Sequence, residues 1–160
     1  MFGFSEIVER LGGNPADILR ECGLDPIVLK RDDMYYSFRR GAMSLEIAAN
    51  TLNRPSFGLE YAQSLPDQFH NLGPIVFTAY FEDTLRDWFN AAMSYINFHT
   101  NALSLQLIED TGGGHGVLRI HMDSAAIPGR QSIEHLLGVI CRLVGRVSRN
   151  PDIVPLSIGF

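Results

Sequence analysis

The spacing of apolar residues changes along the chain between a helical and an alternating period. Through about residue 100, apolar side chains recur every three or four positions, which places them on one face of a helix. Between residues 103 and 122 they alternate with polar side chains, as in a half-buried strand. The helical spacing returns after residue 130. The pattern therefore predicts a helical N-terminal part, a β-hairpin and then a long helix.

Turn and capping residues divide the N-terminal part into separate helices. Asn14 is expected to cap a helix whose next residue is proline, and Gly23 is expected to end it. A longer helix is predicted over residues 37–52, and Ser56 is expected to cap a short helix after it. The stretch 65–73 is the one segment that has the character of a linker within the fold.

Capping signals are clearest in the middle of the chain. Thr84, with Asp87 three residues later, has the arrangement of a capping box and predicts a helix there. The glycine-rich segment 110–116 is predicted to be a hairpin loop, because glycine tolerates positive φ angles. This loop joins two strands, of which the first carries Leu103, Leu105 and Leu107 and the second carries Leu118, Ile120 and Met122.

The last part of the sequence is expected to complete a sheet. A long helix over 130–147 is followed by the apolar segment 153–160, which is predicted to be a strand that pairs with the hairpin. The expected fold class is α+β, with an N-terminal helical subdomain followed by an antiparallel sheet of at least three strands packed with a long helix. Because the sequence stops at Phe160 inside this predicted strand, we expect it to be a fragment of a longer protein.

Composition limits the class of partner. The 160 residues are enough for one domain, and 46% apolar and 19% charged residues are ordinary globular values. The 13 basic and 18 acidic residues give a net charge of −5, which disfavours direct binding to the phosphates of nucleic acid. The two cysteines, Cys22 and Cys141, lie in apolar helical patterns and are expected to be buried thiols in a reducing cytoplasm. No window has the length of a membrane span, so no membrane partner is expected.

Sequence motifs of enzymes are missing, and no catalysis, cofactor or metal is expected. The sequence contains no phosphate-binding loop after a strand, no nucleophile elbow and no paired-cysteine zinc spacing. His99 falls on the apolar face of its predicted helix. It is expected to end that helix by donating to main-chain carbonyls, with an axial ligand to a buried cofactor as the alternative.

Candidate ligand-binding residues come from two segments. Aromatic residues crowd the segment 77–98, which offers either plain core or the wall of an apolar pocket. The helix 130–147 carries a stripe of small residues, which indicates close approach of another element or the floor of a cavity, and beside it an arginine that is either solvated or available to an anionic ligand. A small molecule is expected to bind between these segments, and the candidate residues are Phe77, Tyr80, Phe81, Phe89, Tyr95, Gly138, Cys141 and Arg142.

Several short strings, in order along nearly the whole chain, resemble the N-terminal effector domain of AraC-type transcription regulators, the domain often labelled arabinose-binding. They are Gly12-Gly13-Asn14-Pro15, Cys22-Gly23-Leu24-Asp25-Pro26, Leu45-Glu46-Ile47-Ala48-Ala49, Ser56-Phe57-Gly58-Leu59, Leu72-Gly73-Pro74, Arg130-Gln131-Ser132-Ile133-Glu134 and Pro155-Leu156-Ser157-Ile158-Gly159-Phe160. Ile158 stands where the family usually has valine. The resemblance transfers no ligand residue, because the family has no common binding motif that maps onto this sequence.

The resemblance implies a cytoplasmic regulatory domain over residues 1–160. It would bind a small-molecule effector, form a homodimer, and reach DNA through a C-terminal helix-turn-helix domain that this sequence lacks. Two alternatives stay open: a structural dimerisation module without a ligand, and a haem-type gas sensor that uses His99. The order of elements is also similar to haem nitric oxide/oxygen-binding domains, although the sequence lacks their Tyr-x-Ser-x-Arg string.

Overall fold

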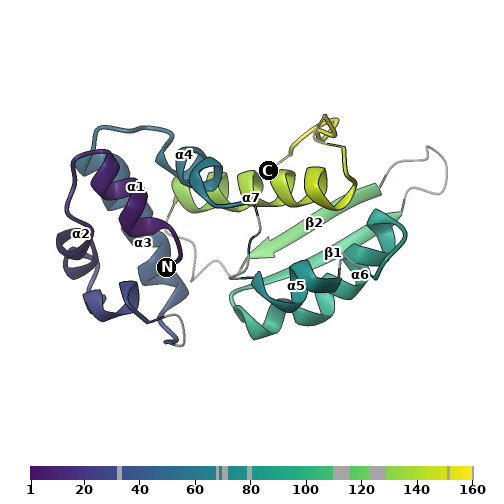
Figure 1. Ribbon diagram of the computed structural model, residues 1–160, viewed down its shortest axis with the longest axis horizontal. Coiled ribbons are helices and arrows are strands. Elements are labelled where there is room, and N and C mark those ends of the chain that lie inside the picture. The colour runs from purple at the N-terminus through teal and green to yellow at the C-terminus, as the bar shows by residue number, and fades with distance from the viewer. Residues whose placement is uncertain are drawn as a thin grey trace. The chain divides into compact units, whose positions relative to one another are not determined.

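The computed structural model describes residues 1–31, 34–67, 69, 72–78, 81–109, 116–122, 129–150 and 152–159. In this part of the chain, helices predominate and the sheet has two strands (Figure 1). The chain divides into two compact units. Unit 1 comprises Met1–Asp67 and Ala125–Arg142, and unit 2 comprises Gln68–Ser124 and Leu143–Phe160.

Unit 1 is built from helices, and the capping residues of the sequence explain where two of them begin. Asn14 Oδ1 accepts from the backbone N–H of Ala16 at 3.0 Å, and Ser37 Oγ accepts from Arg40 at 3.5 Å, so both predicted helices are confirmed. The elements of unit 1 are α1 (Phe4–Arg10), α2 (Pro15–Glu21), the 3-10 helix η1 (Pro26–Leu29), α3 (Phe38–Thr51), α4 (Phe57–Ser64) and the N-terminal part of α7 (Arg130–Val147).

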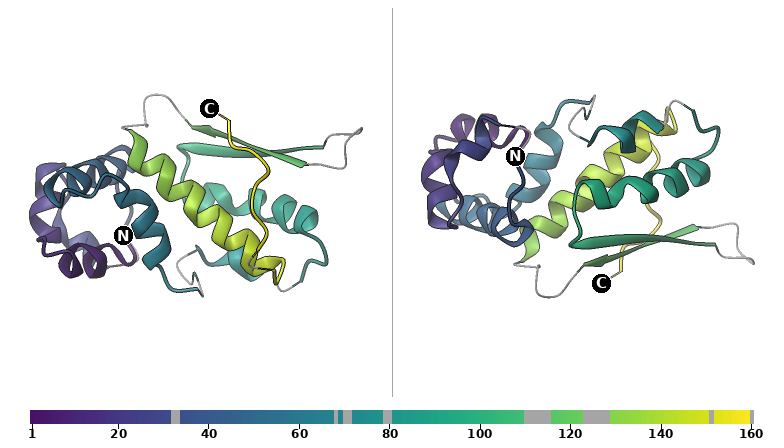
Figure 2. Two further views of the ribbon diagram at one scale, coloured as in Figure 1. Left: turned by 90° about the horizontal axis from the view of Figure 1, so that it is seen from above. Right: turned by 90° about the horizontal axis from the view of Figure 1, so that it is seen from below.

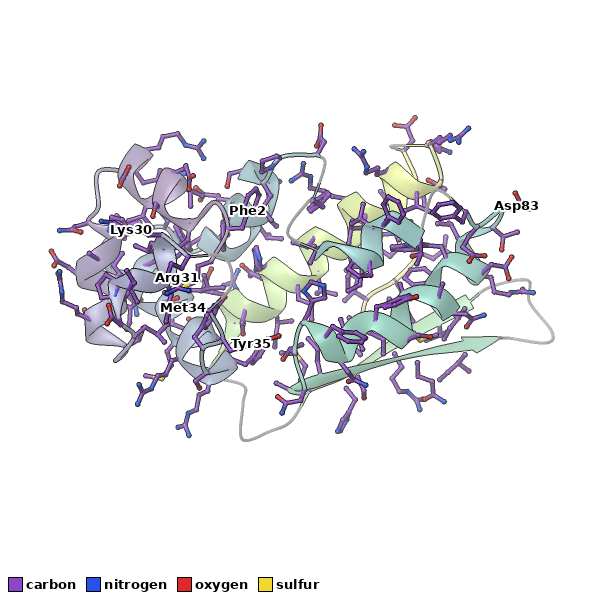
Figure 3. The ribbon with its side chains drawn as sticks, turned by 60° about the horizontal axis from the view of Figure 1, so that its bottom comes forward. Phe2, Lys30, Arg31, Met34, Tyr35 and Asp83 are labelled. Atoms are coloured by element: carbon purple, nitrogen blue, oxygen red, sulfur yellow. The ribbon has the colours of Figure 1, made fainter. Side chains whose placement is uncertain are left out.

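An aromatic cluster forms the centre of unit 1. The ring of Phe4 meets the rings of Phe57 and Tyr61 edge-on, with centroids 6.2 and 5.9 Å apart. Both phenylalanines are fully buried. The Tyr61 hydroxyl donates at 2.6 Å to the carbonyl of Phe2, the residue labelled in Figure 3, so this buried phenol has a polar partner. Burial raises the pKa of Tyr61. The cluster fixes α1 against α4.

Helix α4 begins without the cap that the sequence predicts. The side chain of Ser56 makes no capping hydrogen bond among the described residues, so that expectation is wrong. Instead, Gln131 of α7 lies beside the start of α4. Its Oε1 accepts from the backbone N–H of Gly58 at 2.7 Å, and its Nε2 donates to the carbonyl of Pro55 at 2.8 Å. The cap of α4 therefore comes from a residue far away in the sequence.

Helix α7 is held at its own start by α3. The backbone N–H of Gln131 donates to Glu46 Oε1 at 2.6 Å, which places a carboxylate at the N-terminus of the helix, where the helix dipole favours it. The helix spans the predicted residues 130–147. Of its predicted apolar positions, Leu143 is buried and the others are half-buried. In the described part of the chain, no helix is both long and apolar enough to cross a membrane.

Unit 2 combines short helices with the hairpin. Thr84 Oγ1 accepts from the backbone N–H of Asp87 at 3.1 Å, which confirms the predicted cap. Trp88 is buried, and its indole N–H donates to the carbonyl of Ile75 at 2.9 Å, which ties α6 to α5. Helix α6 packs along β1 (Figure 2). The elements are α5 (Pro74–Phe77), α6 (Leu85–Tyr95), the 3-10 helix η4 (Ile96–Phe98), β1 (Leu103–Glu109), β2 (Gly116–Met122) and the end of α7.

The two strands confirm the predicted hairpin. They are antiparallel, with Leu103 opposite Met122 and Leu107 opposite Leu118, so the alternating leucines share one face. The predicted loop over 110–116 lies outside the described residues except for Gly116.

The predicted third strand is wrong, and with it the sheet of at least three strands. The described residues 153–159 form no ladder, and the structure is mostly helical with a small sheet. Pro155 has no N–H to donate to a neighbouring strand. The prediction rested on the apolar character of the segment 153–160, but Val154, Leu156 and Ile158 are 72%, 82% and 51% exposed. Apolar residues therefore did not indicate burial here.

A substitution at Gly58 tests the close approach of α4 and α7. A Cβ at this position would lie 2.1 Å from the carbonyl oxygen of Gln131, and backbone on both sides leaves little room to move. We expect Gly58→Ala to lower the free energy of unfolding by about 3 kcal/mol, as overpacking does in a tight core. Urea denaturation measures this change. Gly116→Ala is the matched control, because its Cβ would make an ordinary contact of 3.7 Å with Leu107. Equal stability of the two variants would contradict the close approach.

His135 adds a titratable group to this interface. Its ring stacks on Tyr61, with centroids 4.3 Å apart and an interplanar angle of 15°. Nδ1 is buried and has no hydrogen-bond partner in the part of the chain that the structure describes. Burial lowers the pKa of His135 from 6.5 to about 4, although a backbone hydrogen bond at Gly58 opposes this shift.

The depressed pKa of His135 predicts loss of stability in acid. Above about pH 6.5, the His135 ring is neutral in both the folded and the unfolded protein. As the pH falls toward 4, the unfolded state takes up the proton first, so the folded state loses up to about 3 kcal/mol over this window. His135→Phe keeps an aromatic ring and removes the titration. We expect its free energy of unfolding to fall less than that of the wild type between pH 7 and 4.5. Parallel pH profiles of the two proteins would contradict this prediction.

Candidate functional site

Two exposed aromatic pairs lie in unit 2. Phe77, at the end of α5, and Phe81 are 62% and 71% exposed, and their ring centroids are 5.4 Å apart. Tyr95, at the end of α6, and Phe98 of η4 are 36% and 72% exposed, with centroids 6.2 Å apart. Exposed apolar side chains that cluster are more informative about a binding surface than those scattered singly. We refer to these four residues as the exposed aromatic pairs.

The other aromatic candidates have different surroundings. Phe89 is half-buried and packs against Trp88, with ring centroids 4.8 Å apart. It therefore contributes to the interior of unit 2 more than the exposed aromatic pairs do. Tyr80 lies outside the described residues. The prediction that these aromatic residues bind a ligand stays a prediction.

The small residues of α7 adjoin α4. A Cβ on Gly138 would lie 2.7 Å from the Cβ of Ala62, so the glycine permits close approach of the two helices, the first of the two expectations for the stripe. Cys141 is half-buried, and burial raises the pKa of its thiol, which leaves it protonated near neutral pH. Both observations concern packing within unit 1. A role for Gly138 or Cys141 in binding a ligand stays a prediction.

Arg142 has partners in unit 1. Its guanidinium donates to the carbonyl oxygens of Ala62 at 2.5 Å and Leu65 at 2.8 Å, and it forms an ion pair with Asp67. The side chain is 23% exposed, so it is not the freely solvated arginine that was one of the two expectations. A ligand that used Arg142 would have to compete with these acceptors.

His99 is the remaining residue with a predicted chemical role. It follows η4 in the chain and is exposed, and its Nε2 lies 2.9 Å from the carbonyl oxygen of Leu72. Because a carbonyl only accepts, Nε2 carries the proton in this contact. The ring thus bonds to a main-chain carbonyl, as expected, but the carbonyl belongs to the segment before α5. Within the described residues, no three His, Cys, Asp or Glu side chains lie close enough together to hold a metal ion.

The residue that sequence reasoning missed is Gln131. It is 4% exposed and bonds to α3 and to both sides of the start of α4. A glutamine in the first turn of a helix ordinarily faces water, and its acceptors and donors here lie more than 70 residues away. No local pattern in the sequence could have revealed it.

Comparison of the sequence with known proteins identifies a family that covers most of the chain. Residues 12–160 match the family described as the arabinose-binding domain of AraC transcription regulators, N-terminal. The chain is also similar to the HTH-type transcriptional regulator VirS from two strains of Mycobacterium tuberculosis. Each is 28% identical over 111 residues, which are 69% of this chain and 32% of the relative. The aligned region thus spans about a third of the length of the curated relatives.

The family match covers all of the described elements except α1. It includes the α4–α7 contacts in unit 1 and the exposed aromatic pairs in unit 2, and it agrees with the resemblance found in the sequence. The chain therefore belongs to the family of N-terminal arabinose-binding domains of AraC transcription regulators.

Proposed function

We propose that this chain is the sensing domain of a transcription regulator, which binds a small-molecule effector and relays its presence to a helix-turn-helix domain that binds DNA. The observation that carries the proposal is the family match over residues 12–160. The similarity to a regulator named as HTH-type supports the role in transcription. The net charge of −5 fits a domain that does not itself contact DNA phosphates.

The exposed aromatic pairs are the part of the effector site that the geometry favours. Small-molecule sites are mostly apolar with a few polar groups, and Phe77 and Phe81 present two rings side by side to an incoming ligand. An apolar or aromatic effector, such as an aromatic acid or a fatty acid, can pack against such rings. Any effector must bind two states of the domain with different affinity, because otherwise it shifts no equilibrium.

Thermal-shift screening tests the sensing function. We expect one class among amino acids, fatty acids and aromatic acids to raise the melting temperature. A ligand at 100 times its Kd stabilises the folded state by about 2.7 kcal/mol. Phe77→Ala and Phe81→Ala are expected to reduce this shift. Leu156→Ala is the control, because Leu156 is 82% exposed and belongs to no exposed aromatic pair. A shift that all three variants retain would contradict the aromatic site, and no shift from any class would contradict sensing by this domain.

A dimerisation module is the second candidate function, and exposed apolar surface favours it. The exposed aromatic pairs and the half-buried apolar positions of α7 would gain by burial against a second copy. In this case the chain acts as a structural part of the regulator and needs no ligand.

Light scattering separates the two functions. If the chain is a dimerisation module, it has twice the mass of one chain, and Leu137→Glu or Phe98→Glu reduces that mass to one copy, because a buried unpaired carboxylate is costly. Ser104→Glu is the control, since Ser104 is an exposed polar residue of β1. A monomer at all concentrations would contradict the dimerisation module and leave the thermal-shift result to decide the sensing function.

A further inference from the structure

Among the described residues, no backbone N–H caps the C-terminal end of α4. Its C-cap residue Leu65 is extended, with φ −65° and ψ 144°, and the next residue is Pro66, which has no N–H to reach back to the helix. The carbonyls of the last turn therefore need donors from elsewhere. Ser64 Oγ supplies one of them and donates to the carbonyl of Tyr61 at 2.8 Å.

A second donor is Arg142 of α7. One guanidinium nitrogen, Nη1, serves the carbonyls of Ala62 and Leu65, while Nη2 pairs with the carboxylate of Asp67. The fork of fixed N–H groups lets a single arginine reach all these acceptors, and a positive charge at a helix C-terminus is favoured by the helix dipole. Arg142 thus caps α4 across 80 residues of sequence.

The reach of Arg142 depends on how close the two helices lie. Gly138 is one turn before Arg142 on α7, and a Cβ there would overlap the Cβ of Ala62 at 2.7 Å. The short separation is possible because Gly138 has no side chain. A movement of α7 away from α4 would therefore draw the guanidinium away from the carbonyls that it caps.

The capped segment is also where the chain leaves unit 1. The boundary between the units falls after Asp67 and again after Arg142. The ion pair between Asp67 and Arg142 joins these two points, and Asp67 is 82% exposed whereas Arg142 is 23% exposed. The arginine is the fixed partner of the pair, since its Nη1 is already held by backbone.

We propose that Arg142 acts as a latch between α7 and the end of α4. Its hydrogen bonds hold the last turn of α4 and the segment Leu65–Asp67, by which the chain leaves unit 1 (the exit), only while α7 stays in place. With α7 in place, the turn is capped and the exit is held. When α7 shifts, the same turn keeps the bond from Ser64 but loses the donors of Arg142, and the exit is released. In this arrangement Arg142 acts by holding the backbone carbonyls of Ala62 and Leu65 in position. The inference goes beyond the proposed function and involves no effector, so either can fail without the other.

Amide hydrogen exchange on the whole chain tests the latch. Arg142→Gln is expected to speed exchange of the amides of residues 61–65 by about tenfold or more, as loss of hydrogen bonds from a charged donor predicts, while the amides of α1 and α2 keep their rates. Arg142→Lys keeps the charge without the fork and is expected to give an intermediate rate. Arg130→Gln is the matched control, because it removes the ion pair of Arg130 with Glu134 on the same helix and leaves the latch intact.

Two further variants distinguish a latch from an ordinary local contact. Gly138→Ala should push α7 from Ala62 and speed exchange at the same amides, although it alters neither Arg142 nor Asp67. Pro66→Gly gives α4 a backbone donor of its own, so Arg142→Gln should then have a smaller effect. Faster exchange spread evenly over unit 1, or normal rates at residues 61–65 in Gly138→Ala, would overturn the proposal. If Arg142→Gln does not fold, Arg142→Lys and Gly138→Ala decide the question on the same amides.

Discussion

The contact between α4 and α7 is the interaction on which unit 1 depends. A helix of eight residues is too short to be stable alone, and both ends of α4 leave polar groups that its own neighbours in sequence do not satisfy. Gln131 serves the first turn and Arg142 serves the last. Between them, Gly58 and Gly138 let the backbones approach closely enough for these side chains to reach. The two helices therefore form one cooperative structure.

This contact also organises the interior of the unit. Helix α7 is anchored by Glu46 of α3, and α4 carries Phe57 and Tyr61 into the aromatic cluster with Phe4 of α1. Polar capping and aromatic packing thus join α1, α3, α4 and α7 in a single network. Loss of one cap would destabilise the aromatic core as well as the end of the helix, because α4 carries both the capped ends and two members of the aromatic cluster.

The sequence predicts what local chemistry determines. The caps Asn14, Ser37 and Thr84, the two strands of the hairpin and the extent of α7 follow from residue types at short spacing, and the structure confirms them. The caps of α4 come from side chains 73 and 80 residues away, so no local pattern shows them. The false strand at 153–159 has a different cause. An apolar segment forms a strand only where another strand offers hydrogen bonds and a layer covers one face.

The candidate site shows the same limit. Aromatic crowding over 77–98 was visible in the sequence, and helical spacing placed Trp88 on a buried face, as the structure confirms. The sequence did not show that Phe77 and Phe81 would stay exposed. Small residues on α7 indicated close approach, and only the structure identifies Ala62 of α4 as the neighbour. Residue type gives the kind of contact, whereas the partner depends on the tertiary fold.

The long-range capping of α4 has a consequence for how the chain acquires its structure. A ribosome delivers the N-terminal helices first, yet Arg142 emerges 80 residues after Ala62, whose carbonyl it serves. Until then, α4 has neither cap, and closing so large a loop is entropically costly and slow. During synthesis, the N-terminal helices therefore lack the side chains that cap α4, and these become available only when α7 has been made.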